Sequence, residues 1–317
     1  MSNSLLVEAR SLTKTYPARN GTPPFRAVDG IDFELERGEA FGFLGPNGAG
    51  KSSTMRMIGA TSPSTGGALR VLGMDPARNG PEIRARIGVV PQDDCLDREL
   101  TVRENLFVYG RYFGLRKNVI LERISGLLAF AQLEDKSDAR VEALSGGMRR
   151  RLTIARSLIN EPEILLLDEP TTGLDPQARH VLWDRLFRLK QDGVTLIMTT
   201  HYMDEAEQLC DRLAVMDAGR IVGEGSPREL IDAHVTREVL ELRFPVDVQR
   251  SAAECVREAE LGDRIEQLPD RVVIYTDDGE AALARIHAMS LTPVTALVRR
   301  ATLEDVFLKL TGRSLVD

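Results

Sequence analysis

A glycine-rich loop between an apolar run and an expected helix restricts the fold of this chain more than any other feature. The loop reads GPNGAGKSS over residues 45–53, follows the apolar run AFGFL at 40–44 and leads into KSSTMRMIGA at 51–60. Glycines let backbone N–H groups curl around phosphate oxygens, while Lys51 reaches the terminal phosphates and the Ser52 hydroxyl binds Mg²⁺. A glycine-rich turn formed by chance is the alternative, and the flanking strand and helix argue against it. The candidate nucleotide-binding residues of the loop are Gly45, Pro46, Asn47, Gly48, Ala49, Gly50, Lys51, Ser52 and Ser53.

Three apolar runs predict buried parallel strands. They are AFGFLG at 40–45, EILLLDE at 163–169 and VTLIMTTH at 194–201. Strands buried on both faces carry such continuous runs, which are typical of parallel sheets covered by helices. The stretch from Leu5 to about Leu35 differs, because its apolar and polar residues alternate. This alternation predicts antiparallel strands with one solvent-exposed face. We therefore expect an α/β fold with a mostly parallel core and an N-terminal antiparallel β subdomain.

Two consecutive carboxylates end the second apolar run. In LLLDEP at 165–170, Asp168 is placed to hold Mg²⁺ through water, and Glu169 is placed to polarise a water that attacks a γ-phosphate. Two acids could instead simply terminate a strand. The phosphate loop in the same chain favours the catalytic interpretation over this alternative.

The pattern of elements predicts further subdivisions. TVRENLFVYGRYF at 101–113 opens with Thr101 and Glu104 in capping-box spacing, and a second amphipathic helix follows it. We expect an inserted helical subdomain at about 93–160. After about residue 236, strand-like and helical segments alternate and predict a small C-terminal α+β domain. The predicted domains are 1–235 and 236–317.

Composition excludes several classes of protein. The formal net charge is −7, from 41 basic and 48 acidic residues, which argues against a general nucleic-acid binder. The three cysteines are far apart and form no CxxC pair, so neither a disulfide framework nor a zinc site is expected. No apolar run approaches the ~18 residues of a membrane span, so we expect a soluble chain whose membrane role, if any, comes through a partner.

Further motifs in order make the sequence similar to the ATP-binding cassette (ABC) ATPases, a family of P-loop NTPases. The resemblance covers about residues 5–235. Tyr16 in LTKTYP resembles the aromatic that stacks on adenine, and Gln92 in VVPQDD resembles the Q-loop glutamine. LSGGM at 144–148 resembles the signature motif and GLD at 173–175 the D-loop, while His201 resembles the switch histidine. Outside this context, Tyr16 and His201 would be read as an ordinary strand-end tyrosine and a hydrogen-bonded histidine.

The resemblance implies a mechanism with ATP and Mg²⁺ as cofactors. Two copies of the cassette would pack head to tail, with Ser145, Gly146 and Gly147 of one copy facing the γ-phosphate bound by the other. Glu169 would act as general base, His201 would hold the γ-phosphate and the water in line, and Lys51 would contact the phosphates. Gln92 would contact Mg²⁺ and report on a membrane partner, and Asp175 would couple the two sites.

Within the family, the sequence resembles the ATPases of two-component exporters. DRELTVRENLFVYGRYFGL at 97–115, LDEPTTGLDPQARHVLW at 167–183 and ATLEDVFLKLTGR at 301–313 are similar to the nodulation-factor (lipochitooligosaccharide) and daunorubicin-type exporter ATPases. The resemblance implies an integral membrane permease on a separate chain and a peripheral location at the cytoplasmic face of the inner membrane. The alternative is a soluble family member that serves translation or repair. Such proteins usually carry two cassettes or a long coiled coil, and neither feature is present.

Two details of the helical subdomain give further expectations. Phe107, Tyr109, Tyr112 and Phe113 are candidates for contact with the permease, although most are expected to serve a helical core. Arg149, Arg150 and Arg151 follow the signature at a helix start, where the backbone dipole disfavours cations. We therefore expect these three arginines to be unfavourable in a single chain and to be satisfied only when a second subunit delivers a phosphate.

Overall fold

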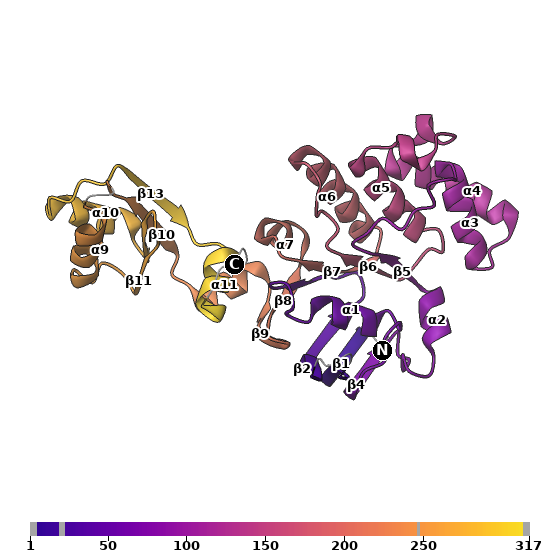
Figure 1. The fold of residues 1–317 in the computed structure, drawn as a ribbon, viewed down its shortest axis with the longest axis horizontal. Coiled ribbons are helices and arrows are strands. Elements are labelled where there is room, and N and C mark those ends of the chain that lie inside the picture. Colours follow the sequence, from indigo (N-terminus) through magenta and orange to yellow (C-terminus); the bar gives the residue numbers. More distant parts are fainter. Residues whose placement is uncertain (1–4, 19–22, 246–247, 313–317) are drawn as a thin grey trace. The chain divides into compact units, whose positions relative to one another are not determined.

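A computed structural model gives the fold (Figure 1) and describes residues 5–18, 23–245 and 248–312. Contacts divide the chain into two compact units, Met1–Glu224 and Gly225–Asp317. The outer ends of the two predicted domains, residues 1–4 and 313–317, lie outside the described residues.

A six-stranded sheet forms the centre of the first unit. Its strands, in order across the sheet, are β5 (Ile87–Val90), β6 (Ile164–Asp168), β7 (Thr195–Thr200), β3 (Ala40–Leu44), β8 (Arg212–Asp217) and β9 (Arg220–Gly225). The strands from β5 to β8 pair in parallel. Every residue of β3 and β7 is buried, which confirms the prediction of doubly covered parallel strands. Because parallel strands end at the same edge, this order brings the residues after β3, β6 and β7 together.

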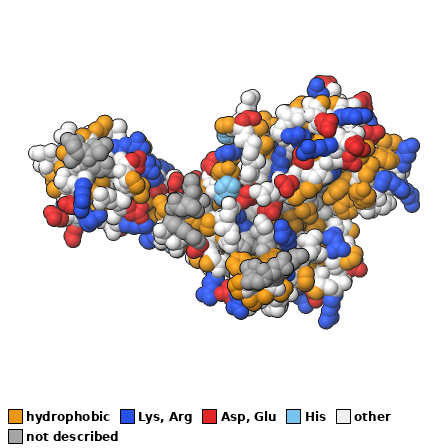
Figure 2. All heavy atoms as spheres, viewed as in Figure 1, with side chains coloured by type: hydrophobic (Ala, Val, Ile, Leu, Met, Phe, Trp, Pro, Cys, Tyr) orange, Lys and Arg blue, Asp and Glu red, His pale blue; other side chains and the backbone are white. Residues whose placement is uncertain are grey.

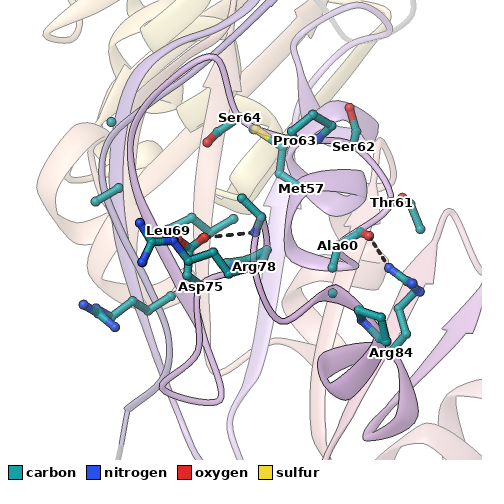
Figure 3. A pocket seen from close by; sticks show the side chains of 17 residues that line it. Met57, Ala60, Thr61, Ser62, Pro63, Ser64, Leu69, Asp75, Arg78 and Arg84 are labelled. Carbon is teal, nitrogen blue, oxygen red and sulfur yellow. Dashed lines mark hydrogen bonds and ion pairs between the residues drawn. The ribbon is translucent and has the colours of Figure 1, made fainter.

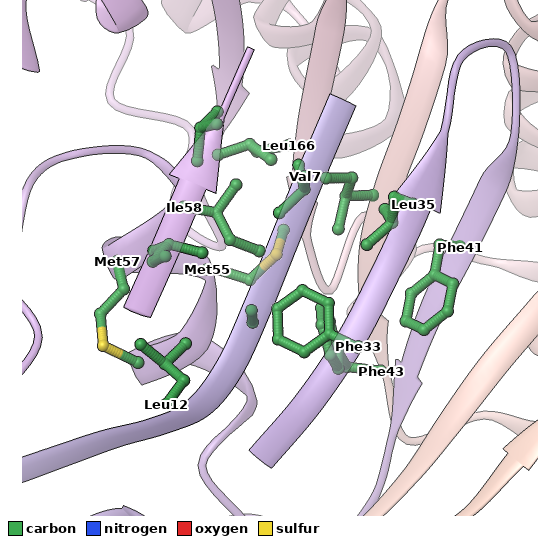
Figure 4. Close-up of a cluster of buried hydrophobic side chains, with 14 of the residues drawn as sticks. Val7, Leu12, Phe33, Leu35, Phe41, Phe43, Met55, Met57, Ile58 and Leu166 are labelled. Carbon is green, nitrogen blue, oxygen red and sulfur yellow. The ribbon is translucent and has the colours of Figure 1, made fainter. Parts of the chain in front are cut away.

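A second sheet of the first unit is antiparallel, as the alternating pattern predicts. Its order is β2 (Phe25–Glu36), β1 (Leu5–Tyr16) and β4 (Gly66–Val71). Figure 4 shows the core that this sheet shares with β3 and α1 (Lys51–Ile58). The Phe33 ring lies 5.2 Å from the Phe43 ring, and Phe41 and Phe43 are 5.3 Å apart, both pairs edge to face. Each fully buried phenylalanine contributes about 1.5–3 kcal/mol, so this cluster fixes the strand that leads into the phosphate loop.

The predicted helical subdomain is present. Its helices are α3 (Val102–Tyr112), α4 (Lys117–Ala131) and α5 (Gly146–Ser157), with short 3₁₀ turns at Glu134–Lys136 and Val141–Ala143. The capping box at Thr101 and Glu104 is formed as predicted. Its core includes Leu106 and Leu152, and Tyr109 packs partly against that core. Tyr112 is 79% exposed. The other helices of the unit are α2 (Gly80–Ala85), α6 (Pro176–Gln191) and α7 (Met203–Leu209).

The second unit is an α+β structure. A four-stranded antiparallel sheet has the order β11 (Arg264–Gln267), β12 (Val272–Thr276), β10 (Glu238–Arg243) and β13 (Thr295–Arg300). The helices are α8 (Pro227–His234), α9 (Gln249–Glu258), α10 (Gly279–Ala288) and α11 (Leu303–Thr311). Leu240, Leu242 and Ile274 share a core with apolar residues of α9 and α10, whereas Val239, Val273 and Tyr275 form a cluster on the opposite face.

The compact units divide eleven residues before the predicted domain boundary at 235/236. The reason is that α8, which the sequence analysis assigned to the first domain, packs against α11 of the second unit. The division into an ATPase domain and an accessory domain stays a prediction.

Charged side chains of both signs are interspersed on the face of the molecule that Figure 2 shows. Within residues 5–18, 23–245 and 248–312, no helix combines the length and the apolar character that crossing a bilayer requires.

Candidate functional site

The phosphate loop connects β3 to α1 and is closely packed. Gly50 has φ +105°, and a Cβ atom there would lie 2.4 Å from the carbonyl oxygen of Ala27. A Cβ at Gly45 would lie 2.3 Å from the carbonyl oxygen of Met216. Space therefore restricts both positions to glycine, and at Gly50 the left-handed backbone conformation adds a second reason.

Lys51 directs its ammonium group into this loop. Its Nζ donates hydrogen bonds to the carbonyl oxygens of Gly45, at 2.6 Å, and Pro46, at 3.1 Å. Burial lowers the pKa of Lys51, and the carboxylates of Glu169 and Asp168 oppose that shift. A buried cation with its donors aimed into a glycine-rich loop is suited to bind an anion there.

Ser52 and Asp168 meet across the edge of the sheet. The Ser52 hydroxyl donates to Oδ1 of Asp168 at 3.2 Å, and the Thr199 hydroxyl on β7 donates to the same oxygen at 2.5 Å. Ser52, Gln92 and Asp168 line one pocket of about 330 Å³. Hydroxyl, amide and carboxylate oxygens are the hard ligands that Mg²⁺ prefers, and Mg²⁺ usually keeps several waters, so these residues fit that ion.

Glu169 lies at the centre of the predicted catalytic residues. Its Oε2 accepts a hydrogen bond from Nε2 of Gln92 at 3.3 Å. Its Oε1 lies 4.0 Å from Nζ of Lys51 and 3.3 Å from Nδ1 of His201, although the latter pair lacks hydrogen-bond alignment. The backbone of Glu169 has φ +44°, in the left-handed region that costs a non-glycine residue of order 1–3 kcal/mol. Hydrogen bonds from its N–H to Thr199 hold this conformation.

Tyr16 lies at the rim of the phosphate loop. Its hydroxyl and the Ser53 hydroxyl are 3.2 Å apart, which ties the end of β1 to the first turn of α1. Nζ of Lys14 lies 5.0 Å from the centre of the Tyr16 ring, a cation–π contact. The expected stacking of this ring on adenine stays a prediction.

The signature and D-loop residues form a second group. Ser145 caps α5 by accepting a hydrogen bond from the N–H of Met148 at 3.3 Å, and Asp175 caps α6 by accepting from the N–H of Ala178 at 2.8 Å. The two helix starts are neighbours, because a Cβ at Gly147 would lie 3.2 Å from Cβ of Ala178. Ser145, Gly146 and Asp175 are exposed, and nothing lies within 4 Å of an added Cβ at Gly146. The predicted residues thus form two groups, one around the phosphate loop, where Lys51 and Glu169 are buried and Gln92 is exposed, and an exposed group at the starts of α5 and α6.

The expectation that Arg149, Arg150 and Arg151 lack partners in a single chain is wrong. Arg149 pairs with Asp94 at 3.6 Å, and Arg151 donates to the side-chain oxygen of Gln132 at 2.5 Å. Arg150 is buried and donates only to backbone carbonyl oxygens. The helix dipole is too small to outweigh these charge-assisted hydrogen bonds.

Sequence reasoning also missed Glu205 on α7. Its side chain is fully buried, and burial raises its pKa despite the nearby polar groups of Thr200, Thr171 and Trp183. A charged residue in a helical stretch is normally read as solvated, so the sequence held no signal for the burial of either Arg150 or Glu205.

A larger pocket of about 600 Å³ lies elsewhere, between the end of α1, β4 and α2 (Figure 3). Its polar groups bond within the chain, as Arg84 does to the carbonyl oxygen of Ala60 at 2.7 Å. None of the predicted site residues lines it.

Comparison with known proteins relates both units to characterised families. The model for "ABC transporter" matches residues 28–172, and that for "Nodulation factor export protein NodI, C-terminal domain" matches residues 249–312. The Nod factor export ATP-binding protein I of Cupriavidus metallidurans is 49% identical over 92% of this chain and 94% of that relative. Its namesake from Rhizobium meliloti is 48% identical over 99% of this chain and 90% of that relative.

Solved structures of similar fold include cassettes of ABC transporters. A dimeric ATP-binding cassette in a post-hydrolysis state, bound to ADP and Pi, has a TM-score of 0.63 at 27% identity and covers 69% of this chain and 98% of that one. The cbiO1 protein of Clostridium perfringens, part of the ABC transporter complex cbiONQ, has a TM-score of 0.65 at 28% identity. It covers 82% of this chain and 96% of that one.

Proposed function

Since the chain belongs to the family of ABC transporter ATPases that includes the Nod factor export ATP-binding proteins I, we propose that it drives a two-component exporter. It is the subunit that binds and hydrolyses ATP, and a separate permease carries the cargo. The single observation that supports the catalytic part best is the convergence of Lys51, Gln92 and His201 on Glu169.

Each residue of the group around the phosphate loop has a distinct task in hydrolysis. Lys51 and the N–H groups of residues 45–50 bind the phosphates, and Glu169 accepts the proton of the attacking water. His201 holds that water and the γ-phosphate in line. Ser52 and Asp168, with Gln92, would hold Mg²⁺, which neutralises phosphate charge when bound. Catalysis of this kind rests on positioning and electrostatics and needs no covalent intermediate.

ATP binding joins two copies of the chain into a dimer. The exposed group of Ser145, Gly146, Gly147 and Asp175 contains no lysine, whereas Lys51 lies in the phosphate loop of the other group. Serine and bare N–H groups at a helix start form an anion site. A head-to-tail dimer therefore completes each site with the second copy, and phosphate release lets the dimer reopen.

The permease docks at a groove of about 360 Å³ beside the helical subdomain. The segment 89–100 and α3 form most of the lining of this groove, with Tyr109 and Tyr112 among their residues. Two of the four aromatic candidates from the sequence, Phe107 and Phe113, pack partly against the helical core and do not line the groove. Docking there holds the chain at the cytoplasmic face of the inner membrane.

The cargo is an amphipathic compound of the lipochitooligosaccharide or drug type. Support comes from the export named in the relatives and from the match of residues 249–312 to the NodI C-terminal domain. A role in a non-transport process such as translation or repair is the alternative. ATPase activity that rises when the permease is added favours export over that alternative.

Two variants test the catalytic assignment. Glu169→Gln should bind ATP, accumulate as a dimer and lose nearly all turnover, whereas Lys51→Ala should bind ATP weakly. Glu163→Gln is the matched control, because this glutamate directly precedes β6, at the end of the strand opposite to Glu169, and pairs with Arg37 and Arg86. Normal turnover by Glu169→Gln would remove this residue from the role of base.

The docking groove has its own test. Purified chain and permease in liposomes should show ATPase stimulation that Tyr112→Glu abolishes. Leu121→Glu serves as control, because Leu121 is an exposed apolar residue on the neighbouring helix α4 and does not line the groove. Equal loss of stimulation in both variants would contradict docking at this groove.

A further inference from the structure

We propose that Arg150 is a positioning residue that fixes the backbone of the Gln92 segment and of the Glu169 segment to the signature helix α5. The proposal rests on the proposed function, in which Glu169 is the general base and Gln92 contacts Mg²⁺. The side chain of Arg150 donates its hydrogen bonds to backbone carbonyl oxygens. It acts through the two side chains whose backbone it holds.

The guanidinium of Arg150 uses every donor it has. Nε donates to the carbonyl oxygen of Pro170 at 2.7 Å, and Nη1 donates to those of Pro91, at 2.5 Å, and Gln92, at 3.2 Å. Nη2 donates to the carbonyl oxygens of Asp168, at 3.1 Å, and Glu169, at 3.2 Å. A guanidinium carries five N–H groups in a rigid planar fork, so all five are satisfied at once.

These acceptors belong to the two segments that carry the catalytic side chains. Residues 91–92 follow β5, and residues 168–170 end β6. The Arg150 guanidinium holds the carbonyl groups of Gln92 and Glu169 together, and Nε2 of Gln92 lies 3.3 Å from Oε2 of Glu169. The directions of five hydrogen bonds to a planar fork fix the relative position of the two segments more tightly than one ion pair could.

Arg150 also links this pair of segments to the exposed group. It lies five residues after Ser145 on α5, within the same rigid helix. A displacement of the start of α5, where the phosphate of a second copy would bind, therefore moves the carbonyl groups of Gln92 and Glu169 through Arg150. Loss of Arg150 uncouples phosphate capture at Ser145 from the placement of the base.

A second buried arginine on the same helix provides a matched control. Arg156 is 8% exposed and Arg150 is 6% exposed. Arg156 donates to the carbonyl oxygens of Cys95, at 2.7 Å, and Asp94, at 3.3 Å, and to no residue of the 168–170 segment. Removing either guanidinium takes a hydrogen-bond donor from buried or part-buried carbonyl groups, which costs stability in both cases. Only Arg150 holds the catalytic segments.

The experiment compares Arg150→Met with Arg156→Met in the full chain. Melting temperature, ATP dissociation constant, kcat and the Mg²⁺ concentration for half-maximal activity are measured for each. Arg150→Met should lower kcat roughly 10- to 100-fold, the range for misplaced catalytic groups, with ATP affinity retained and a higher Mg²⁺ requirement. Arg156→Met should lower the melting temperature by about as much as Arg150→Met does. Its kcat, measured at a temperature where both variants are folded, should stay near that of the parent.

Conservative variants keep the test valid if a methionine variant fails to fold. A lysine supplies three donors and cannot span both segments, so Arg150→Lys should recover part of the stability and still lower kcat relative to Arg156→Lys. Equal effects on kcat and on Mg²⁺ dependence at the two positions would overturn the proposal. Glu169→Gln is run in parallel. If that variant turns over normally, the proposed function fails. If it is inactive while Arg150 and Arg156 behave alike, only the positioning role fails.

Discussion

Replacement of Asp305 by asparagine should selectively destabilise the second unit. Asp305 is 1% exposed at the start of α11 and accepts hydrogen bonds from both Nη atoms of Arg299, at 2.7 and 2.9 Å. It also accepts from the N–H and the hydroxyl of Thr302, at 2.8 and 3.1 Å. Asparagine keeps the shape, but it removes the charge and turns one acceptor oxygen into a donor that faces other donors.

The magnitude follows from which groups lose their partners. Removing one member of a buried ion pair costs about 3–5 kcal/mol. The Arg299 side chain is 27% exposed and retains Glu241 as a partner at 2.7 Å, so we expect the lower end of the range, about 3 kcal/mol. The loss should depend on pH. Burial would raise the pKa of Asp305, but the Arg299 guanidinium and the Thr302 N–H outweigh it and hold the pKa below its ordinary value near 3.8. The stabilisation is therefore complete well above that value and is lost as pH falls through the lower pKa of the folded state.

Two optical signals separate the units in a urea titration. Trp183, the one tryptophan of the sequence, lies on α6 of the first unit. The second-unit transition should therefore change far-UV circular dichroism with little change in tryptophan fluorescence. With m of about 1–1.5 kcal/mol/M for a unit of this size, the midpoint of that transition should fall by roughly 2–3 M urea at pH 7. Glu304→Gln, an exposed neighbour with the same charge change, is the control. A shift no larger than that control, or a difference that persists unchanged at pH 3, would refute the reasoning.

Three further predictions follow from single side chains. Gly50→Ala should lower the free energy of unfolding by about 2 kcal/mol or more and weaken ATP binding, because the new Cβ strains the left-handed backbone and meets the Ala27 carbonyl oxygen. Thermal melts with and without ATP measure both effects, and an unchanged ATP-induced rise in melting temperature would contradict the second. Thr101→Ala should lower the free energy of unfolding by about 1 kcal/mol, because it removes the capping box of α3. Urea unfolding measures this, and a change as small as that of an exposed surface substitution would show that the cap does not stabilise the helix. Glu205→Gln should become more stable relative to the parent as pH rises above about 4.5, because burial raises the pKa of Glu205 and the folded parent must then lose the proton of a buried carboxyl group. Melting temperatures measured across pH check this, and a difference between the two proteins that stays constant with pH would contradict it.

Local patterns made much of the fold predictable. The strands β3, β6 and β7 carry continuous apolar runs that only a covered sheet explains, and the helix starts at Thr101 and Ser226 have both members of a capping box. The loop at 45–53 and the acids at 168–169 could be found because glycine spacing and charge at a strand end are visible in a single sequence. The structure brings these residues together at one sheet edge, and their individual roles stay predictions.

The parts that were missed depend on contacts between distant residues. Strand β11 reads RIEQ, which is short and mostly polar, and it exists because β12 pairs with it. The first compact unit ends eleven residues before the predicted domain boundary because α8 packs against α11, about seventy residues further on, and no local signal records that contact. Arg150 and Asp305 are buried charges, and a sequence does not show which charge will find partners inside.

The left-handed turn at Glu169 has a consequence for how two adjacent acids can serve one nucleotide. In an extended strand, neighbouring side chains project from opposite faces of the sheet, so one of two consecutive carboxylates would face away from the phosphates. At φ +44°, the chain leaves the pleat at Glu169, and this break in alternation lets Asp168 reach Ser52 while Glu169 reaches Lys51 and His201. A β-branched residue at 169, which resists φ above zero, would return the chain to the pleat and turn this position away from Lys51 and His201.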